Sequence, residues 1–455
     1  MRPAVIIGGG ISGLSAAYYL SKAGIRSTLI EREPRLGGVI RTETVAGCVL
    51  EAGPDSFLSV KPWALDLIRE LGLASEVIGS NDHLRVTYVR KRGRLVPLPD
   101  GLMLMIPTKI LPMLWTGLLS WPTKLRMGLE WFRRPMSAPR QDCSVAEFVT
   151  DHYGLEAVDY LAEPLLAGVY GGDPHKLSVV SVLPRFIELE SKYGSLTKGV
   201  LAERRRAAAQ SAPLFRTLKR GLGHLVEGLQ AAANPGPEVL HGAAEVVERQ
   251  GEGYRVRIGG EWLETGQVVL ACQAYQAGAL LRGLDPELAE LLASVPYSSS
   301  MTIALGFEKA GFSHPLNGFG FLVPKRERRR LVACTWVGTK FSCRVPEGMV
   351  LLRCFLGGED ASALSESDQA LVAAVREELR DIMGLTAAPV FTRLSRWPRS
   401  MAQYTVGHQD RVAQIEARLR QTPGLQLAGN AYYGIGIPDC IRMGKQAAER
   451  ITARR

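Results

Sequence analysis

The sequence has few features that would point to a metal site, a disulfide framework or a redox dithiol. Its seven cysteines are an odd number and no two of them form a CxxC pair. They are Cys48, Cys143, Cys272, Cys334, Cys343, Cys354 and Cys440. Such spacing predicts neither a zinc site nor paired disulfides. It is typical of a reducing compartment, where thiols serve as small hydrophobic groups.

Long uncharged apolar runs are also missing. No stretch reaches the ~20 apolar residues that a membrane-spanning helix needs, and the first residues lack a signal-peptide pattern. A cytoplasmic protein is therefore expected. Residues 102–119 come closest, but Pro107, Lys109 and Pro112 interrupt them, and proline breaks a straight helix. Residues 101–134 leave two interpretations open: amphipathic pieces at the inner face of the cell membrane, or a buried helix pair above a ligand cavity.

Acidic residues are in the minority. The 455 residues include 55 basic and 45 acidic ones, which gives a net charge of +10. An anionic membrane surface, an acidic small molecule or a merely solvated surface would each account for this excess. No zinc-finger spacing or other nucleic-acid signature occurs, so no nucleic-acid partner is expected. The length predicts a globular chain of two or three domains.

A dinucleotide signature stands at the N-terminus. Apolar residues 3–7 predict a strand, and a helix should follow and end near Gly24. Between them lie Gly8, Gly9, Gly10, Ile11, Ser12 and Gly13. In this motif the first glycine permits a tight turn, the second lets a pyrophosphate approach, and the third packs the helix on the sheet. The helix N-terminus then offers free N–H groups to the phosphates.

Glu31 ends the second predicted strand, where a carboxylate can bind both ribose hydroxyls and repel a 2′-phosphate. The residues that follow, Arg32, Gly37 and Gly38, resemble the second fingerprint of the amine-oxidase-like FAD family. In that family this stretch runs along the extended cofactor. The resemblance implies FAD rather than a nicotinamide cofactor. Binding should be non-covalent, because Cys440 falls inside the predicted C-terminal helix and not in the turn before it.

Three further segments complete the FAD site that this resemblance implies. The loop of Gly53, Pro54, Asp55 and Ser56 should lie near the isoalloxazine ring. Near the C-terminus, Gly429, Ile435, Gly436 and Ile437 belong to a second strand–turn–helix unit, with its helix expected from Cys440 to Ala453. That helix N-terminus suits the negative edge of a reduced flavin. Among the strands predicted in residues 238–271, Val246 should contact the adenine, with an ordinary core valine as the alternative.

Segments in the middle of the chain make the resemblance more specific. They are residues 163–173, 176–178, 318–324, 396–398, 403–408 and 434–440. With them, nearly the whole chain resembles the oxygen-dependent porphyrinogen oxidases of haem synthesis, which include protoporphyrinogen oxidases and Gram-positive-type coproporphyrinogen III oxidases. This implies a six-electron oxidation of coproporphyrinogen III or protoporphyrinogen IX, with dioxygen as the acceptor and hydrogen peroxide as a product. The porphyrin would be handed to the next enzyme of the haem pathway.

The same resemblance nominates three more residues. Lys61 matches a lysine of the coproporphyrinogen subgroup and is the candidate for a substrate propionate, with a solvated lysine as the alternative. Gly168 should lie over the pocket and leave room for the macrocycle, unless it is a helix-packing glycine. Trp397 should neighbour the flavin, unless it is a core residue. No side chain is assigned a catalytic role and no metal is expected.

The fold class expected is α/β. A Rossmann-like FAD-binding domain would be discontinuous, with residues 1–85, 213–285 and 390–455. An inserted helical, membrane-facing domain would take residues 86–212, and a mixed-sheet substrate domain residues 286–389. The alternative functions on this fold are an amine oxidase, a carotenoid desaturase and a non-enzymatic carrier of an apolar ligand. A carrier should have lost the phosphate glycines or the flavin-edge turn, and both are present.

Overall fold

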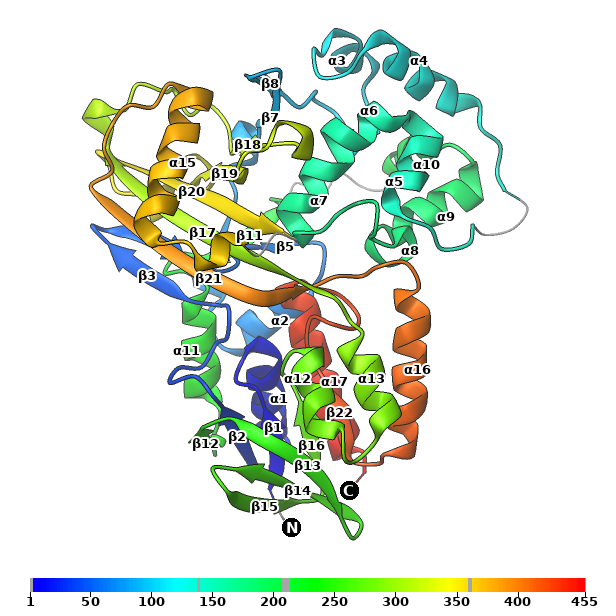
Figure 1. Ribbon diagram of the computed structural model, residues 1–455, viewed down its shortest axis with the longest axis vertical. Helices are drawn as coiled ribbons and strands as arrows, with labels where there is room; N and C mark the ends of the chain where they lie inside the picture. The colour runs from blue at the N-terminus through cyan, green and yellow to red at the C-terminus, as the bar shows by residue number, and fades with distance from the viewer. Residues whose placement is uncertain (1–2, 137–139, 207–212, 359–361, 455) are drawn as a thin grey trace. The chain divides into compact units, whose positions relative to one another are not determined.

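The computed structural model describes residues 3–136, 140–206, 213–358 and 362–454 (Figure 1). The chain divides into two compact units, each built from separate stretches of sequence. Unit 1 comprises Met1–Ser80, Pro213–Tyr297 and Gln409–Arg455, and unit 2 comprises Asn81–Ala212 and Ser298–His408. The α/β class predicted from the sequence is confirmed, whereas the limits of the three predicted domains stay a prediction.

Unit 1 is built on a five-stranded parallel sheet. In spatial order its strands are β12 (Glu238–His241), β2 (Ser27–Glu31), β1 (Ala4–Ile7), β16 (Val268–Leu270) and β22 (Leu425–Leu427). Strand β1 is wholly buried, and Ile7 is in register with Ile30 on one side and Leu270 on the other. Because all five strands run the same way, their carboxyl ends meet at one edge, which is where this class of sheet binds ligands.

Helices accompany this sheet in the same unit (Figure 1). They are α1 (Ile11–Lys22), α2 (Trp63–Glu70), α11 (Gly223–Ala232), α12 (Ala274–Leu281), α13 (Pro286–Ala293), α16 (His408–Gln421) and α17 (Ile437–Thr452). Helices α1 and α17 approach so closely that a Cβ on Gly444 would overlap the Ser12 carbonyl oxygen. Helix α17 begins at Ile437, three residues before Cys440, and Pro438 lies in its first turn, where proline is suited.

Smaller sheets flank the parallel one. They are the pair β3 (Thr42–Val45) and β4 (Cys48–Glu51), the set β5 (Phe57–Leu58), β11 (Phe215–Leu218) and β6 (Val77–Gly79), and the set β13 (Ala244–Gln250), β14 (Gly253–Ile258) and β15 (Glu261–Thr265). The pairing of β13 with β14 is irregular between Ala244 and Val246. A bulge of this kind leaves backbone groups unpaired with the neighbouring strand.

Unit 2 contains a seven-stranded mixed sheet. Its order is β21 (Phe391–Ala402), β17 (Tyr297–Glu308), β20 (Met349–Gly358), β19 (Leu331–Trp336), β18 (Gly320–Leu322), β7 (Thr87–Lys91) and β8 (Arg94–Pro97). Helix α15 (Asp368–Met383) buries Leu371, Val375 and Leu379 in the same core cluster as Ile303 and Leu352 of the sheet. These buried apolar contacts pack α15 against the sheet and stabilise the core of unit 2.

The helical part of unit 2 lies between β8 and unit 1's β11 in the sequence. Its main helices are α3 (Ile110–Trp115), α4 (Trp121–Leu129), α5 (Val145–Tyr153), α7 (Glu163–Tyr170), α9 (Pro184–Tyr193) and α10 (Leu196–Arg206). Large apolar side chains of α3 and α4 are exposed, so these helices are not buried on every side. Whether they cover a ligand cavity stays a prediction. Among the described residues, no helix combines the length and the apolar character needed to span a bilayer.

Buried charges hold these helices together. The ring of His152 in α5 lies between two carboxylates, with Nδ1 3.2 Å from Glu130 Oε1 and Nε2 3.1 Å from Glu190 Oε1. Arg140 pairs with Glu190 at 2.7 Å. The cluster ties the turn after α4 to α5 and α9.

Glu156 holds the other end of α4. Its carboxylate accepts hydrogen bonds from the Ser120 N–H at 2.8 Å and the Thr123 hydroxyl at 2.7 Å, and pairs with Lys91 at 3.0 Å. Burial opposes ionisation, but the hydrogen bonds from Ser120, Thr123 and Lys91 outweigh it and lower the pKa of Glu156 from 4.5 to about 2. Helix α4 is thus anchored at both ends by carboxylates.

We expect Glu156→Gln to reduce the free energy of unfolding at pH 7 by about 2 kcal/mol, the size of a lost charged hydrogen-bond set. The folded pKa lies below the ordinary value of 4.5. The contribution should therefore be complete above that pH and decline as the pH falls toward 2. Urea denaturation at pH 7 and pH 3 measures it. The exposed Glu252→Gln serves as the control, and an equal deficit at both pH values would contradict the assignment.

Candidate functional site

The turn between β1 and α1 is shaped by two glycines that the packing requires. Gly8 has a φ of +108°, a conformation open to glycine. A Cβ on Gly8 would also lie 2.8 Å from the backbone of Ala271. A Cβ on Gly13 would overlap the carbonyl oxygen of Gly8. Any larger residue at either position would push α1 away from the sheet.

Gly10 differs from these two, because no atom of the chain lies within 4 Å of where its Cβ would be. Its backbone is extended, with φ −71° and ψ −179°. Helix α1 begins directly after it, with no side-chain cap and no acidic residue in its first turn. Open space therefore lies beside an uncapped helix N-terminus, which fits a phosphate group.

The acid at the end of β2 supports this turn. Glu31 accepts hydrogen bonds from the N–H of Gly9 at 2.7 Å and the N–H of Glu33 at 2.9 Å, one on each carboxylate oxygen. Each oxygen retains a second acceptor position. Binding of ribose hydroxyls by Glu31 stays a prediction that this geometry permits.

The second glycine pair lies against the first. The N–H of Gly37 donates to the Gly9 carbonyl at 2.8 Å. The guanidinium of Arg35 donates to the carbonyls of Gly38 at 2.5 Å and Ile40 at 3.2 Å. Sequence reasoning named Arg32, an exposed residue beside Glu33, and missed Arg35 as the residue that holds the loop. The cofactor role of Arg32 stays a prediction.

A buried acid ties the next loop down. Glu51, at the end of β4, accepts hydrogen bonds from the Thr42 hydroxyl and the Leu222 N–H, both at 2.7 Å. Gly53, Pro54, Asp55 and Ser56 follow it, and the Ser56 hydroxyl donates to Asp55 at 2.6 Å. Glu51 was not nominated from the sequence, although an acid within an apolar strand is a signal of a buried partner.

The C-terminal turn is also anchored by a carboxylate. Asp439 lies in the first turn of α17, is almost fully buried, and forms an ion pair with Lys61 at 2.6 Å. This pair fixes the turn of Ile435, Gly436 and Ile437 to the segment before α2. Lys61 is 41% exposed, so binding of a substrate propionate by this lysine stays a prediction.

The other predicted residues are distributed over both units. Gly429 follows β22 at the sheet edge, and a Cβ on it would lie 3.8 Å from the carbonyl oxygen of Cys272. Val246 lies in the same unit, half-buried at the bulge of β13. Gly168, exposed on α7, and Trp397, half-buried on β21, belong to unit 2. Their roles stay predictions.

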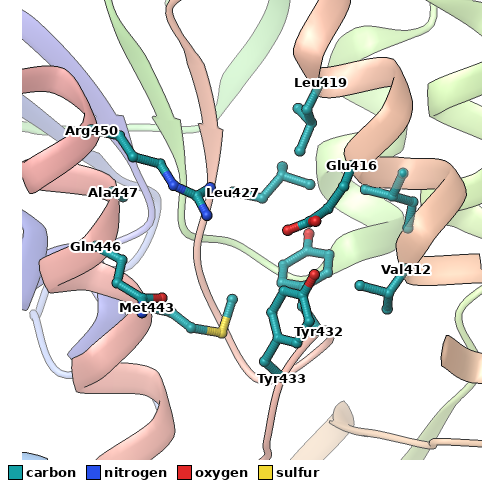
Figure 2. A pocket seen from close by; sticks show the side chains of 11 residues that line it. Val412, Glu416, Leu419, Leu427, Tyr432, Tyr433, Met443, Gln446, Ala447 and Arg450 are labelled. Carbon is teal, nitrogen blue, oxygen red and sulfur yellow. The ribbon is translucent and has the colours of Figure 1, made fainter. Parts of the chain in front are cut away.

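A small cavity lies behind the C-terminal turn, between α16, β22 and α17 (Figure 2). Its volume of about 30 Å³ suits one or two water molecules and excludes a macrocycle. Glu416 and Arg450 extend toward it from the two helices, beside Tyr433 (Figure 2). Burial and the neighbouring Glu416 carboxylate raise the pKa of Tyr433, so its phenol stays neutral.

One group of described residues has the ligand atoms for a metal ion within 4.8 Å of one another: Asp151, His152 and Glu190. Arg140 already bridges Asp151 at 2.6 Å and Glu190 at 2.7 Å. The Arg140 guanidinium therefore already supplies the positive charge among these carboxylates. We interpret the group as a structural charge cluster.

Comparison with known proteins identifies the family of this chain. Residues 11–452 match the family described as flavin containing amine oxidoreductase. The chain belongs to this family. It is therefore a flavin-dependent oxidase. Binding of the cofactor's phosphates in the open space at Gly10, beside the uncapped start of α1, stays a prediction that the geometry permits.

Its relatives extend over the full chain. It is 35% identical to a coproporphyrinogen III oxidase of Bacillus subtilis, over 97% of this chain and 96% of the relative. It is 27% identical to a chloroplastic protoporphyrinogen oxidase of Nicotiana tabacum, over 98% of this chain and 85% of the relative. A crystal structure from Exiguobacterium sp. 255-15, provisionally named a protoporphyrinogen oxidase, is 32% identical with a TM-score of 0.90, covering 100% of this chain and 99% of that chain. The resemblance inferred from the motifs is confirmed.

We expect Gly10→Ala to leave the fold intact, because its methyl group would meet no atom of the chain, yet to block the cofactor's phosphates. Purified Gly10→Ala protein should keep the circular dichroism of the wild-type apoprotein and carry at least tenfold less flavin per chain. Gly13→Ala is the contrasting variant, since its methyl group would overlap Gly8 and should impair folding itself. Full flavin occupancy in Gly10→Ala would contradict the placement.

Proposed function

We propose that this flavoprotein binds FAD non-covalently and oxidises a porphyrinogen to the porphyrin, with coproporphyrinogen III as the preferred substrate. The observation that carries the proposal is the full-length similarity, at 35% and 32% identity, to proteins named coproporphyrinogen III oxidase. The motifs at residues 163–173 and 434–440 support it. Its product would pass to the next enzyme of haem synthesis.

The residues at the sheet edge support FAD held without a covalent bond. Glu31 offers the acid expected beside a ribose that lacks a 2′-phosphate. Cys440 is buried inside α17, and burial raises the pKa of its thiol to about 12. A thiol at such a pKa is a poor nucleophile at neutral pH. The nearest cysteine to the C-terminal turn is therefore unsuited to covalent attachment.

The bound flavin would supply the redox chemistry, taking a hydride from carbon in each of three two-electron oxidations and passing the electrons to dioxygen as hydrogen peroxide is formed. The protein's own part is positioning and shielding. The start of α17 is held in place by the Lys61–Asp439 pair, and its N–H groups would stabilise negative charge on a bound flavin. A substrate with several propionates also suits a chain of net charge +10.

Protoporphyrinogen IX is the second candidate substrate, since the tobacco relative at 27% identity is named for it. Lys61 is the residue that would discriminate, because it matches the coproporphyrinogen subgroup and is still 41% exposed while paired with Asp439. A substrate with four propionates would gain more from such a partly available cation than one with two.

We expect the flavin-loaded protein to convert coproporphyrinogen III to coproporphyrin III with a kcat/KM at least tenfold above that for protoporphyrinogen IX. Porphyrin fluorescence measures the product, and an oxygen electrode should record three dioxygen molecules per porphyrin. The Gly10→Ala protein, expected to lack flavin, controls for oxidation by air. No porphyrin above that control from either substrate would overturn the proposed function.

We also propose that α3 and α4 contact an anionic membrane surface. Their exposed side chains, together with Phe132 of the short turn directly after α4, form what we call the α3–α4 apolar surface. Several are strongly exposed: Trp115 at 86%, Ile110 at 79% and Phe132 at 74%. The other members are Leu111, Trp121, Leu125 and Leu129. Lys124 lies over the Trp121 ring at 4.7 Å. Aromatic rings beside lysines are typical of an interfacial helix.

The double substitution Trp115→Gln and Trp121→Gln should lower binding to phosphatidylglycerol-containing vesicles about tenfold, because both rings lose their apolar contact with the bilayer. Co-sedimentation measures binding, and added salt should weaken it for the wild type. Trp262→Gln, on β15 of the other unit, is the matched control and should bind as the wild type does. Wild-type protein that stays in the supernatant at low salt would contradict the proposal.

A further inference from the structure

Helix α7 (Glu163–Tyr170) is anchored at its first residue. The carboxylate of Glu163 is buried and accepts hydrogen bonds from the Lys325 N–H at 2.9 Å and from Arg328 at 2.8 Å. Lys325 also forms an ion pair with Asp173, just beyond the helix, at 3.0 Å. The turn at Lys325–Glu327 therefore holds the first residue of α7 through Glu163 and the segment after the helix through Asp173.

The last residue of α7 is anchored by a different side chain. The amide nitrogen of Gln403 lies 2.8 Å from the Tyr170 carbonyl, 2.9 Å from the Ser298 hydroxyl and 3.1 Å from the Met401 carbonyl. Gln403 is buried. One amide group thus links the end of α7 to β17, through Ser298, and to β21, through Met401.

The surroundings of Gln403 are built around this amide. Two of its three neighbours are the Tyr170 and Met401 carbonyls, which can only accept hydrogen bonds and therefore need a donor such as this amide. A Cβ on Gly172 would overlap the Gln403 side-chain oxygen, so the turn after α7 leaves its space to the amide. Gln403 belongs to the motif at residues 403–408, to which the proposed function gives no role.

Between these two anchors, α7 presents Gly168 and Val169 at its surface, and Val169 is 58% exposed. A Cβ on Gly168 would have only Leu322 as a neighbour, at an ordinary contact distance of 3.5 Å. Packing against the chain's own atoms therefore does not require a glycine at this position. A ligand that lies against this turn of α7 does account for it.

The segments on either side are held together without Gln403. The N–H of Ser178 donates to the Tyr404 carbonyl at 2.8 Å, and the N–H of Val406 donates to the Lys176 carbonyl at 3.1 Å. Replacing Gln403 should therefore release the last turn of α7 and leave the surrounding fold in place. The effect of the substitution on substrate kinetics can therefore be measured in folded protein.

We propose that Gln403 is a positioning residue, which fixes the C-terminal turn of α7 so that Gly168 and Val169 form one wall for the porphyrinogen macrocycle. This rests on the proposed function. Gln403 touches the substrate nowhere in this scheme and acts through the Tyr170 carbonyl. Its loss should weaken substrate positioning more than it weakens the protein.

The test compares Gln403→Met with a matched control, Glu378→Met, both assayed as flavin-loaded protein. Glu378 is likewise buried, and it accepts hydrogen bonds from the Arg330 N–H at 2.8 Å and the Leu331 N–H at 3.3 Å. Both variants should lower the Tm. Gln403→Met alone should raise the KM for coproporphyrinogen III about tenfold at unchanged flavin content.

A double-mutant cycle with Gly168→Ala tests the route of the effect. Gly168→Ala should raise KM in the wild type, and this effect should shrink at least threefold in the Gln403→Met background, because the helix turn is no longer held against the substrate. Additive effects, or a KM for Gln403→Met equal to that of Glu378→Met, would overturn the role of Gln403. Wild-type protein that turns over neither porphyrinogen would instead overturn the proposed function.

Discussion

The contact between Gly8 and Gly13 is the constraint on which unit 1 depends. With no side chain on Gly13, the first turn of α1 rests on the carbonyl at the end of β1. Helix α17 then packs on α1 through Gly444, where a Cβ would overlap Ser12. Two chain ends that are far apart in sequence therefore belong to one parallel sheet, in which α1 follows β1 and α17 follows β22.

Three carboxylates, of which Glu51 and Asp439 are buried and Glu31 is half-buried, hold loops that glycines leave free to move. Glu31 fixes the first glycine turn, Glu51 fixes the loop before Gly53, and Asp439 fixes the C-terminal turn through Lys61. Each carboxylate bonds to a backbone N–H or a lysine, so its burial is compensated. These acids thus shape the candidate site.

Many positively charged side chains are also paired within the fold. The run Arg328, Arg329 and Arg330 looks in the sequence like a patch for an anionic ligand. In the structure these arginines pair with Glu163, Asp381 and Glu366, at 2.8, 2.9 and 2.6 Å. These ion pairs lie within unit 2, where they attach α7 and α15 to neighbouring turns. A cluster of like charges in sequence is therefore no measure of the field that a ligand meets.

What could be predicted is what depends on neighbours in the sequence. The strand–glycine–helix unit, the acid after β2 and the C-terminal turn follow from local geometry, and the full-length motifs indicated the family. Residues such as Arg35 and Gln403 could not be assigned in this way. Arg35 bonds to carbonyls that only the folded loop brings within its reach, and Gln403 bonds to Tyr170, which is distant in the sequence.

The sequence by itself determined the α/β class, the flavin family and the position of the glycine turn, because φ angles, helix starts and strand ends are set by adjacent residues. Tertiary structure alone decided that Lys61 pairs with Asp439 and that the apolar residues of α3 and α4 are exposed. The ion pair and the exposure depend on which side chains meet in the folded chain. Burial and contacts between distant residues determine both, and residue type alone does not.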